Sequence, residues 1–80
     1  MWYTYALISL KDNHLYIGMT QDVLSRLNRH NSGSVKSTKP RRPFRLIQQW
    51  GHSSVTEART HELFLKSGKG REFIKTFIPR

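Results

Sequence analysis

The sequence predicts a small α/β (α+β) domain in which a three-stranded antiparallel sheet is flanked by helices, in the order β-β-α-β-α-α. Three observations lead to this fold class. Two aromatic and aliphatic runs at the start are separated by a polar turn, a third apolar run lies further on, and two segments carry helix-capping signals. Eighty residues with no internal repeat or linker indicate one domain, residues 1–80.

The first two strands are expected to form a hairpin. Residues 2–10 contain no glycine or proline and are typical of a strand, and residues 15–18 are typical of a shorter one. Asp12-Asn13 between them favours a chain reversal. Tyr5 and Tyr16 fall on these neighbouring strands, so cross-strand pairing could bring both hydroxyls to one face.

The next segments are a helix and a basic loop. A helix is expected over residues 21–30, with Thr20 as its N-cap and an apolar stripe along one side. Residues 31–33, Asn-Ser-Gly, are typical of a C-cap. Residues 34–43 contain two prolines and no apolar period, which indicates a loop.

The last part of the chain is predicted to hold one strand and two helices. Residues 44–50 indicate the third strand, which Gly51 is expected to end. Ser54-Val55-Thr56-Glu57 matches a capping box and opens a helix over residues 55–66. After a turn at residues 67–70, a short helix is expected over residues 71–78.

The charge is strongly basic. The formal net charge is +9, from 14 Lys and Arg against 5 Asp and Glu, which implies attraction to nucleic acid, an anionic membrane surface or an acidic protein. The absence of cysteine excludes disulfide and zinc-thiolate sites and fits the cytoplasm. No apolar run approaches the roughly 20 residues needed to span a bilayer, and no signal peptide is apparent, so we expect no membrane partner.

The densest basic cluster has five positive residues in ten, and it favours contacts with a phosphate backbone over a merely solvated loop. Its members are Lys36, Lys39, Arg41, Arg42 and Arg45.

Five other side chains suggest chemistry, and each has a simpler alternative. Arg26 and His30 are spaced i, i+4 and point the same way on their helix, although they could form a solvated basic face together with Arg29. Glu62 could be a surface ion pair with Lys66. Tyrosines on strands are usually packing residues with a hydroxyl at the rim.

Motifs in order along the chain resemble the GIY-YIG endonuclease family, over residues 2–78. Tyr3-Thr4-Tyr5 takes the place of the first motif, and Tyr16-Ile17-Gly18 is the second, intact. The resemblance is closest to small stand-alone members, through residues 15–18, the Arg-Leu-x-x-His-Asn-Ser-Gly segment at residues 26–33 and Arg-Arg-Pro at residues 41–43.

The resemblance implies a GIY-YIG-like fold and a metal-dependent endonuclease that hydrolyses DNA in line, with Mg²⁺ (or Mn²⁺) as its cofactor. Either Tyr5 or Tyr16 would activate water; we favour Tyr5, with Tyr16 holding the water or the scissile phosphate. Arg26 would stabilise the charge that grows on the phosphate, and Glu62 would hold the metal. His30 would orient water, protonate the leaving oxygen or contact phosphate.

The resemblance also assigns supporting roles. Gly18 would shape the site, through a positive φ or close approach of the phosphate backbone. Arg29, like the basic cluster, would bind the nucleic-acid backbone. Two departures stand out: Tyr3 replaces the glycine of the first motif, and the functional asparagine that many members place after the glutamate is missing, since Asn occurs only at 13, 28 and 31.

Several alternatives stay open at this point. A domain this small has little surface for reading bases, so weak sequence specificity is expected, with single-stranded, branched or damaged DNA as candidate substrates in repair or recombination; RNA is not excluded. We expect a monomer or weak dimer. The basic charge fits equally well a non-catalytic nucleic-acid-binding module, or an interaction domain for an acidic protein or a ribosomal assembly.

Overall fold

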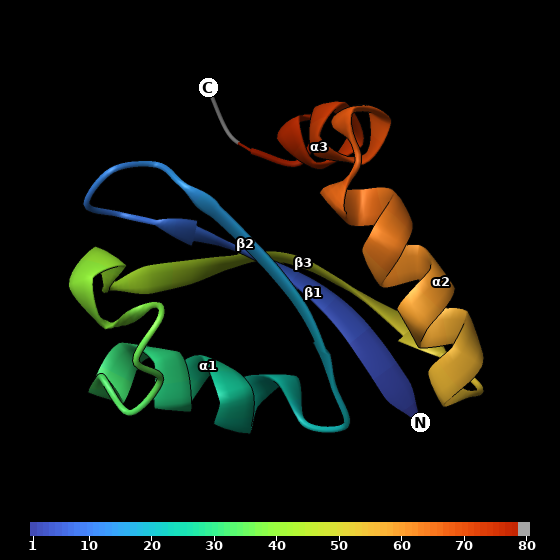
Figure 1. Ribbon diagram of the computed structural model, residues 1–80, viewed down its shortest axis with the longest axis horizontal. Coiled ribbons are helices and arrows are strands. Elements are labelled where there is room, and N and C mark those ends of the chain that lie inside the picture. Colours follow the sequence, from blue (N-terminus) through green and yellow to red (C-terminus); the bar gives the residue numbers. More distant parts are fainter. Residues whose placement is uncertain (79–80) are drawn as a thin grey trace.

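A computed structural model describes residues 1–78 of the chain, and it confirms the predicted order of strands and helices (Figure 1). The strands form one antiparallel sheet in the order β2-β1-β3. The strands are β1 (Trp2–Ser9), β2 (Leu15–Thr20) and β3 (Phe44–His52). The helices are α1 (Val23–Ser32), α2 (Val55–Lys66) and α3 (Gly68–Lys75), with a short 3₁₀ helix η1 (Lys39–Arg41) before β3.

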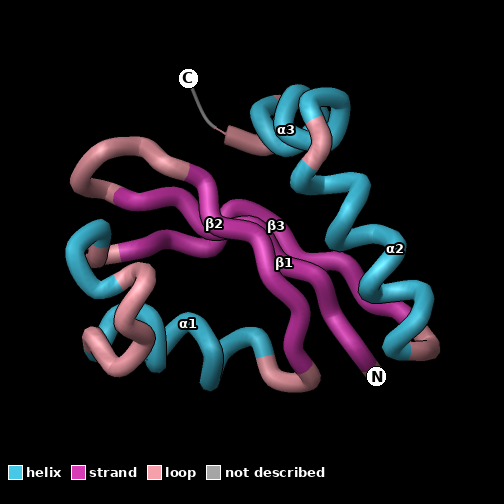
Figure 2. Tube along the Cα trace, viewed as in Figure 1, coloured by secondary structure: helices cyan, strands magenta, loops and turns pink. Residues whose placement is uncertain are grey.

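The central strand β1 is buried on both faces, because helices cover the sheet on each side (Figure 2). Successive side chains of a strand point to opposite faces. Tyr5 and Leu7 therefore pack in one core with residues of α1 and β3, whereas Ala6 packs in a second core with Leu65 of α2 and Ile74 of α3. Helix α1 lies on one side of the sheet, and α2 with α3 on the other.

The start of α1 differs from the prediction. Its N-cap is Asp22, whose carboxylate accepts a hydrogen bond from the Ser25 backbone N–H, and the helix begins at Val23. Thr20 is wrong as the cap because β2 extends to this residue and pairs it with Tyr3. The helix runs to Ser32, two residues beyond the predicted end, and the predicted C-cap is confirmed, since Gly33 has the left-handed φ of 83° that suits this position.

The boundaries of β3 and α3 also differ from the prediction. Strand β3 continues through Gly51, because that residue pairs with Tyr3 of β1 and so keeps its place in the ladder. Helix α3 begins at Gly68, where the expected turn lies, because Ser67 caps it by accepting from the Gly70 N–H. It ends at Lys75, before the predicted end.

The predicted α2 is confirmed at both ends. Ser54 accepts from the Glu57 N–H, which satisfies one of the free donors at the first turn. The return half of the capping box is replaced, since the Glu57 carboxylate accepts from the Ser53 hydroxyl instead. Within residues 1–78, no helix has the length and apolar character needed to cross a membrane.

Candidate active site

Tyr5 lies at the middle of β1 with its side chain on the α1 face of the sheet. It is 1% exposed, and its partner across the β1–β2 ladder is Gly18. The phenol ring covers this glycine and leaves no room for a Cβ there. Among residues 1–78, positive φ angles occur at Asn13 and Gly33 but not at Gly18. The glycine is therefore needed for its small size against Tyr5, and the expected positive φ is wrong.

The predicted pairing of the two tyrosines on one face is present. Tyr16 pairs with Leu7, two residues along from the Tyr5–Gly18 pair, so both phenols point to the same side of the sheet. Tyr16 is half-buried, and so it keeps access to solvent that Tyr5 lacks. Its ring meets the His30 ring edge-on, with the centroids 4.8 Å apart.

His30 projects from the inner side of α1 and is 1% exposed. Both ring nitrogens have partners: Nε2 lies 3.2 Å from the Tyr5 hydroxyl, and Nδ1 lies 2.8 Å from Thr38 Oγ1. Burial lowers the pKa of His30, and the charges of Arg26 and Arg29 lower it further, which favours the neutral ring. A ring so enclosed does not reach a substrate, so the expected contact of His30 with water or phosphate does not fit this placement.

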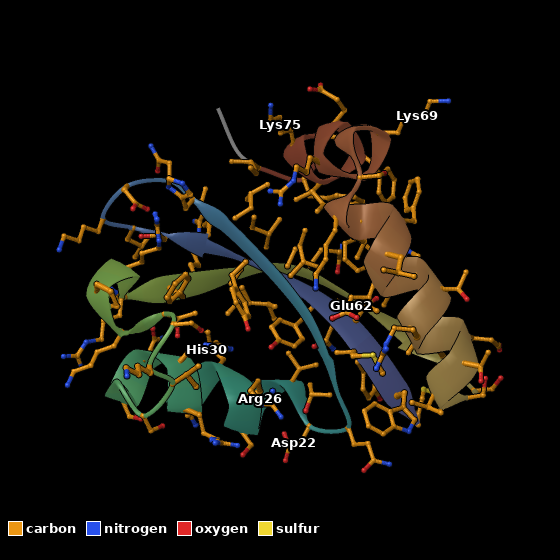
Figure 3. All side chains as sticks on the ribbon, in the orientation of Figure 1. Asp22, Arg26, His30, Glu62, Lys69 and Lys75 are labelled. Carbon is orange, nitrogen blue, oxygen red and sulfur yellow. The ribbon has the colours of Figure 1, made fainter. Side chains whose placement is uncertain are left out.

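Arg26 and Glu62 approach Tyr5 from different helices. Burial raises the pKa of Tyr5 to about 12, with further contributions from Tyr16 and, more weakly, Glu62, while the charge and hydrogen bonding of Arg26 oppose the shift. Figure 3 shows Glu62 extending from α2 toward β2, with Arg26 on α1 beside the same strand. Residues of two helices that are far apart in sequence thus act on one hydroxyl.

Glu62 is mostly buried, as expected for a site residue, and it also forms the ion pair with Lys66 that the simpler interpretation predicted. Its side chain is 13% exposed, and its carboxylate lies 3.6 Å from Arg59 Nε and 3.5 Å from Lys66 Nζ. These contacts are longer than the roughly 2.7–2.9 Å of a charge-assisted hydrogen bond. The lone pairs of the carboxylate therefore keep capacity for another ligand.

A metal here would rely on one protein carboxylate. Within residues 1–78, no three His, Cys, Asp or Glu side chains come together as ligands. That donor set fits Mg²⁺, a hard ion that keeps several waters and uses one or two carboxylates together with substrate phosphate.

The basic loop joins the hairpin turn to form a positive surface. Lys36, Lys39 and Arg42 line a shallow hollow together with Lys11, whose ammonium donates to the Pro40 carbonyl at 3.2 Å. The sequence did not predict a role for Lys11, because this residue lies in the hairpin turn, far from the basic loop in sequence. The sheet brings the turn and the loop side by side.

Three other arginines were predicted to contact the nucleic-acid backbone. Arg41 forms an ion pair with Asp12 and ties the loop to the hairpin, so this guanidinium is already engaged. Arg45 is exposed on β3, and Arg29 is exposed on α1, where it lines a separate hollow with Asp22. None of these three arginines lines the hollow formed by the loop lysines.

Two features had no clear signal in the sequence. Thr38, the partner of His30, is 2% exposed although it lies in a polar loop. On the opposite face of β1 from Tyr5, the Thr4 hydroxyl lies 3.0 Å from His52 Nε2 and 2.7 Å from His61 Nδ1. Both sets of contacts arise from the packing of segments that are distant in sequence, so the spacing of residues along the chain does not predict them.

Comparison with known proteins shows which family this chain is similar to. The family described as the GIY-YIG catalytic domain matches residues 1–75. A UPF0213 protein of Staphylococcus haemolyticus is 39% identical over 75 residues, covering 92% of each chain. A UPF0213 protein of Streptococcus pneumoniae is 43% identical over 68 residues, covering 84% of this chain and 68% of the relative.

A solved structure is also similar. The solution NMR structure of a UPF0213 protein from Bacillus halodurans superposes with a TM-score of 0.56 at 38% identity, covering 95% of this chain and 84% of the other. The family match spans nearly all of the chain, including both tyrosine motifs and Glu62. This chain belongs to the GIY-YIG family.

Proposed function

We propose that the protein is a Mg²⁺- or Mn²⁺-dependent endonuclease that hydrolyses DNA phosphodiester bonds with weak sequence specificity. Family membership supports a nuclease acting on nucleic acid. The observation that carries the proposal is the environment of the Tyr5 hydroxyl, on which Tyr16, Arg26 and Glu62 all act from separate elements. A structural packing tyrosine requires no such group of ionisable neighbours.

Tyr16 is the phenol best placed to contact the attacking water. It is half-buried, whereas Tyr5 is 1% exposed and has a pKa raised to about 12, so Tyr5 stays protonated at neutral pH. This reverses the preference for Tyr5 that the sequence suggested. Tyr5 instead lies with its hydroxyl 3.2 Å from His30 Nε2 and supports the site from its buried side.

Arg26 supplies the positive charge at the reacting phosphate. A guanidinium can bind two phosphate oxygens at once, and it stabilises the extra negative charge of the transition state more than the charge of the ground state. Arg26 is half-buried on α1, which restricts its conformations next to Tyr5. The reaction then needs no covalent enzyme intermediate, because water attacks the phosphorus directly.

Glu62 would hold the metal ion. When bound, Mg²⁺ or Mn²⁺ supplies Lewis-acid polarisation of the phosphate and charge stabilisation at the leaving oxygen. The inward placement of Glu62 and its long contacts with Arg59 and Lys66 support this role.

The basic surface suits a nucleic-acid backbone. Lys11, Lys36, Lys39 and Arg42 line one hollow, and such cations bind phosphates without reading bases. Weak sequence specificity follows, and we propose that the protein acts on DNA in the cytoplasm as a monomer or weak dimer. Cleavage of single-stranded, branched and duplex DNA and of RNA, measured side by side, identifies the substrate form.

The test is metal-dependent cleavage of plasmid and oligonucleotides by purified protein. We expect Glu62→Gln and Arg26→Ala to lose at least 100-fold in rate, in line with the loss of one key charge at a transition state. Glu72→Gln is the matched acidic control, because that side chain is 76% exposed on α3, and Arg71→Ala is the basic control. Equal rates for wild type, Glu62→Gln and Arg26→Ala would remove the assignment.

A binding module without cleavage is the second candidate, and one observation favours it. The chain lacks an asparagine after Glu62, since its three Asn residues all precede β3. Salt-sensitive binding with no cleavage of any DNA or RNA form, with either metal, would favour this candidate.

A further inference from the structure

A chain of hydrogen bonds runs from Tyr5, beside Arg26, into the protein interior. The Tyr5 hydroxyl, on which the charge of Arg26 acts, lies 3.2 Å from His30 Nε2. His30 Nδ1 lies 2.8 Å from Thr38 Oγ1, and the Thr38 hydroxyl donates to the Val35 carbonyl at 3.3 Å. Tyr5, His30 and Thr38 are 1%, 1% and 2% exposed, so they depend on one another for hydrogen bonds.

The direction of this chain is fixed at its inner end. A carbonyl has no proton, so Val35 can only accept from the Thr38 hydroxyl. Each hydroxyl has one proton to give, and Thr38 gives its proton to Val35. The Tyr5 proton therefore goes to His30 Nε2, and the proton of His30 is on Nδ1 and goes to Thr38.

We infer that Thr38 is a positioning residue that holds His30 as the neutral Nδ1–H tautomer and, through Tyr5, orients Arg26. This inference deepens the proposed function, on which the role of Arg26 at the phosphate rests. Thr38 touches neither a substrate nor a metal ligand in this arrangement. Its effect passes along the chain to the guanidinium.

A hydroxyl at residue 38 is required because it accepts and donates at the same time. Its oxygen accepts from His30, and its proton is directed to the carbonyl of the local turn, where the Thr38 backbone N–H also donates, at 3.1 Å. Valine has nearly the same shape but can do neither. Without the hydroxyl, the Nδ1 proton of His30 has no partner, and the ring is free to move its proton to Nε2.

The change to Nε2–H would reverse the bond to Tyr5. His30 would then donate to the phenol oxygen, and that oxygen would have to turn its own proton elsewhere. Arg26 would compete with His30 for the same oxygen. The guanidinium would then no longer be held beside the Tyr5 oxygen.

The first experiment is ¹H–¹⁵N NMR of the histidine rings at neutral pH in wild type, Thr38→Val and Thr38→Ser. The two-bond spectrum shows which ring nitrogen carries the proton, and it requires no enzymatic activity. We expect His30 to be Nδ1–H in wild type and Thr38→Ser, and to shift to Nε2–H or a mixture in Thr38→Val. The exposed His14 should not change. An Nε2–H ring in wild type, or identical spectra for all three proteins, would overturn the inference.

The second experiment measures the steady-state cleavage of DNA by the same variants. We expect Thr38→Val to lose about 10- to 100-fold in kcat with KM within 2-fold, as when partners that orient a catalytic ligand are removed, and Thr38→Ser to restore the rate. An unchanged kcat in Thr38→Val, or an equal loss in Thr38→Ser, would contradict the positioning role. Thr38→Ala replaces Thr38→Val if the valine variant does not fold.

The two experiments separate the inference from the function it deepens. Suppose that the wild-type protein cleaves nothing, whereas the His30 tautomer shifts in Thr38→Val. This result would refute the endonuclease and leave the Thr38–His30 link in place. Cleavage that depends on Glu62 and Arg26 but not on Thr38 would refute the inference alone.

Discussion

Tyr5 lies directly across the β1–β2 ladder from Gly18, and its phenol fills the space beside that glycine. An ideal Cβ at residue 18 would lie 2.5 Å from the Tyr5 hydroxyl oxygen and 2.7 Å from Cζ. Real Cβ atoms do not approach that closely, so any larger residue at this position must displace the phenol. The glycine of the second motif thus fixes the place of the tyrosine of the first.

Gly18→Ala is therefore expected to move Tyr5 and lower both stability and activity. Overpacking of a close-packed site typically costs about 1–3 kcal/mol. Urea unfolding followed by circular dichroism measures the loss, and the cleavage assay reports the displaced hydroxyl. If this variant has wild-type stability and cleavage rate, the Tyr5 ring can move aside without loss, and the prediction is wrong.

The contact between α2 and α3 offers a sharper test of packing. A Cβ at Gly70 would overlap the Phe64 carbonyl oxygen and lie 2.5 Å from Leu65 Cα, and these backbone atoms cannot move aside as a side chain can. We expect Gly70→Ala to lose about 3 kcal/mol or more of unfolding free energy. The measurement is the same denaturant titration.

Gly68→Ala on the same helix is the matched control. A Cβ there meets nothing within 4 Å, so alanine should be neutral or stabilise by up to about 1 kcal/mol through helix propensity. Equal effects at residues 68 and 70 would argue against the close crossing of the two helices.

Tyr5 should make the protein less stable at alkaline pH. Its pKa rises from 10.0 in the unfolded chain to about 12 in the folded one, because burial disfavours the phenolate. Between pH 10 and 12 the unfolded state releases this proton first, so stability is complete below pH 10 and falls as pH rises toward 12. The expected contribution is about 2–3 kcal/mol, since one pKa unit corresponds to about 1.4 kcal/mol.

The measurement compares wild type with Tyr5→Phe, because lysines and other tyrosines titrate in the same range and cancel in the difference. The wild-type curve of unfolding free energy against pH should fall more steeply than that of Tyr5→Phe above pH 10. Parallel curves would indicate that the Tyr5 hydroxyl titrates normally.

The basic hollow should be responsible for much of the salt dependence of DNA binding. Lys36 and Lys39 line it beside Lys11, and removing one cation that binds a phosphate should lower the slope of log K against log salt by about 1. We expect Lys36→Ala and Lys39→Ala each to weaken binding to all sequences alike. Binding is measured with the Glu62→Gln protein, so that no DNA is cut.

Lys75→Ala is the control for this measurement, because its ammonium lies on α3 beside Glu72, with 62% of the side chain exposed. A slope that falls equally in Lys75→Ala would show that overall charge, and not this hollow, attracts the DNA.

Much of the fold could be predicted from local patterns. The capping box at Ser54 defined α2 at its first turn, and Gly33 ended α1, because these residues satisfy helix-end groups within a few positions. The N-cap of α1 was harder to predict, because two nearby residues suit this position equally well. Both Thr20 and Asp22 can cap a helix, and the pairing of Thr20 with Tyr3 across the sheet decided for Asp22.

By itself the sequence determined the order of elements, the basic charge and the pair of tyrosine motifs, since local backbone preferences and residue chemistry are written in short segments. The tertiary structure alone decided that Tyr5 is buried against Gly18, that His30 is enclosed by Tyr5 and Thr38, and that Lys11 joins the basic loop. These contacts arise when the sheet forms and both faces are covered, and no short segment specifies how distant segments pack.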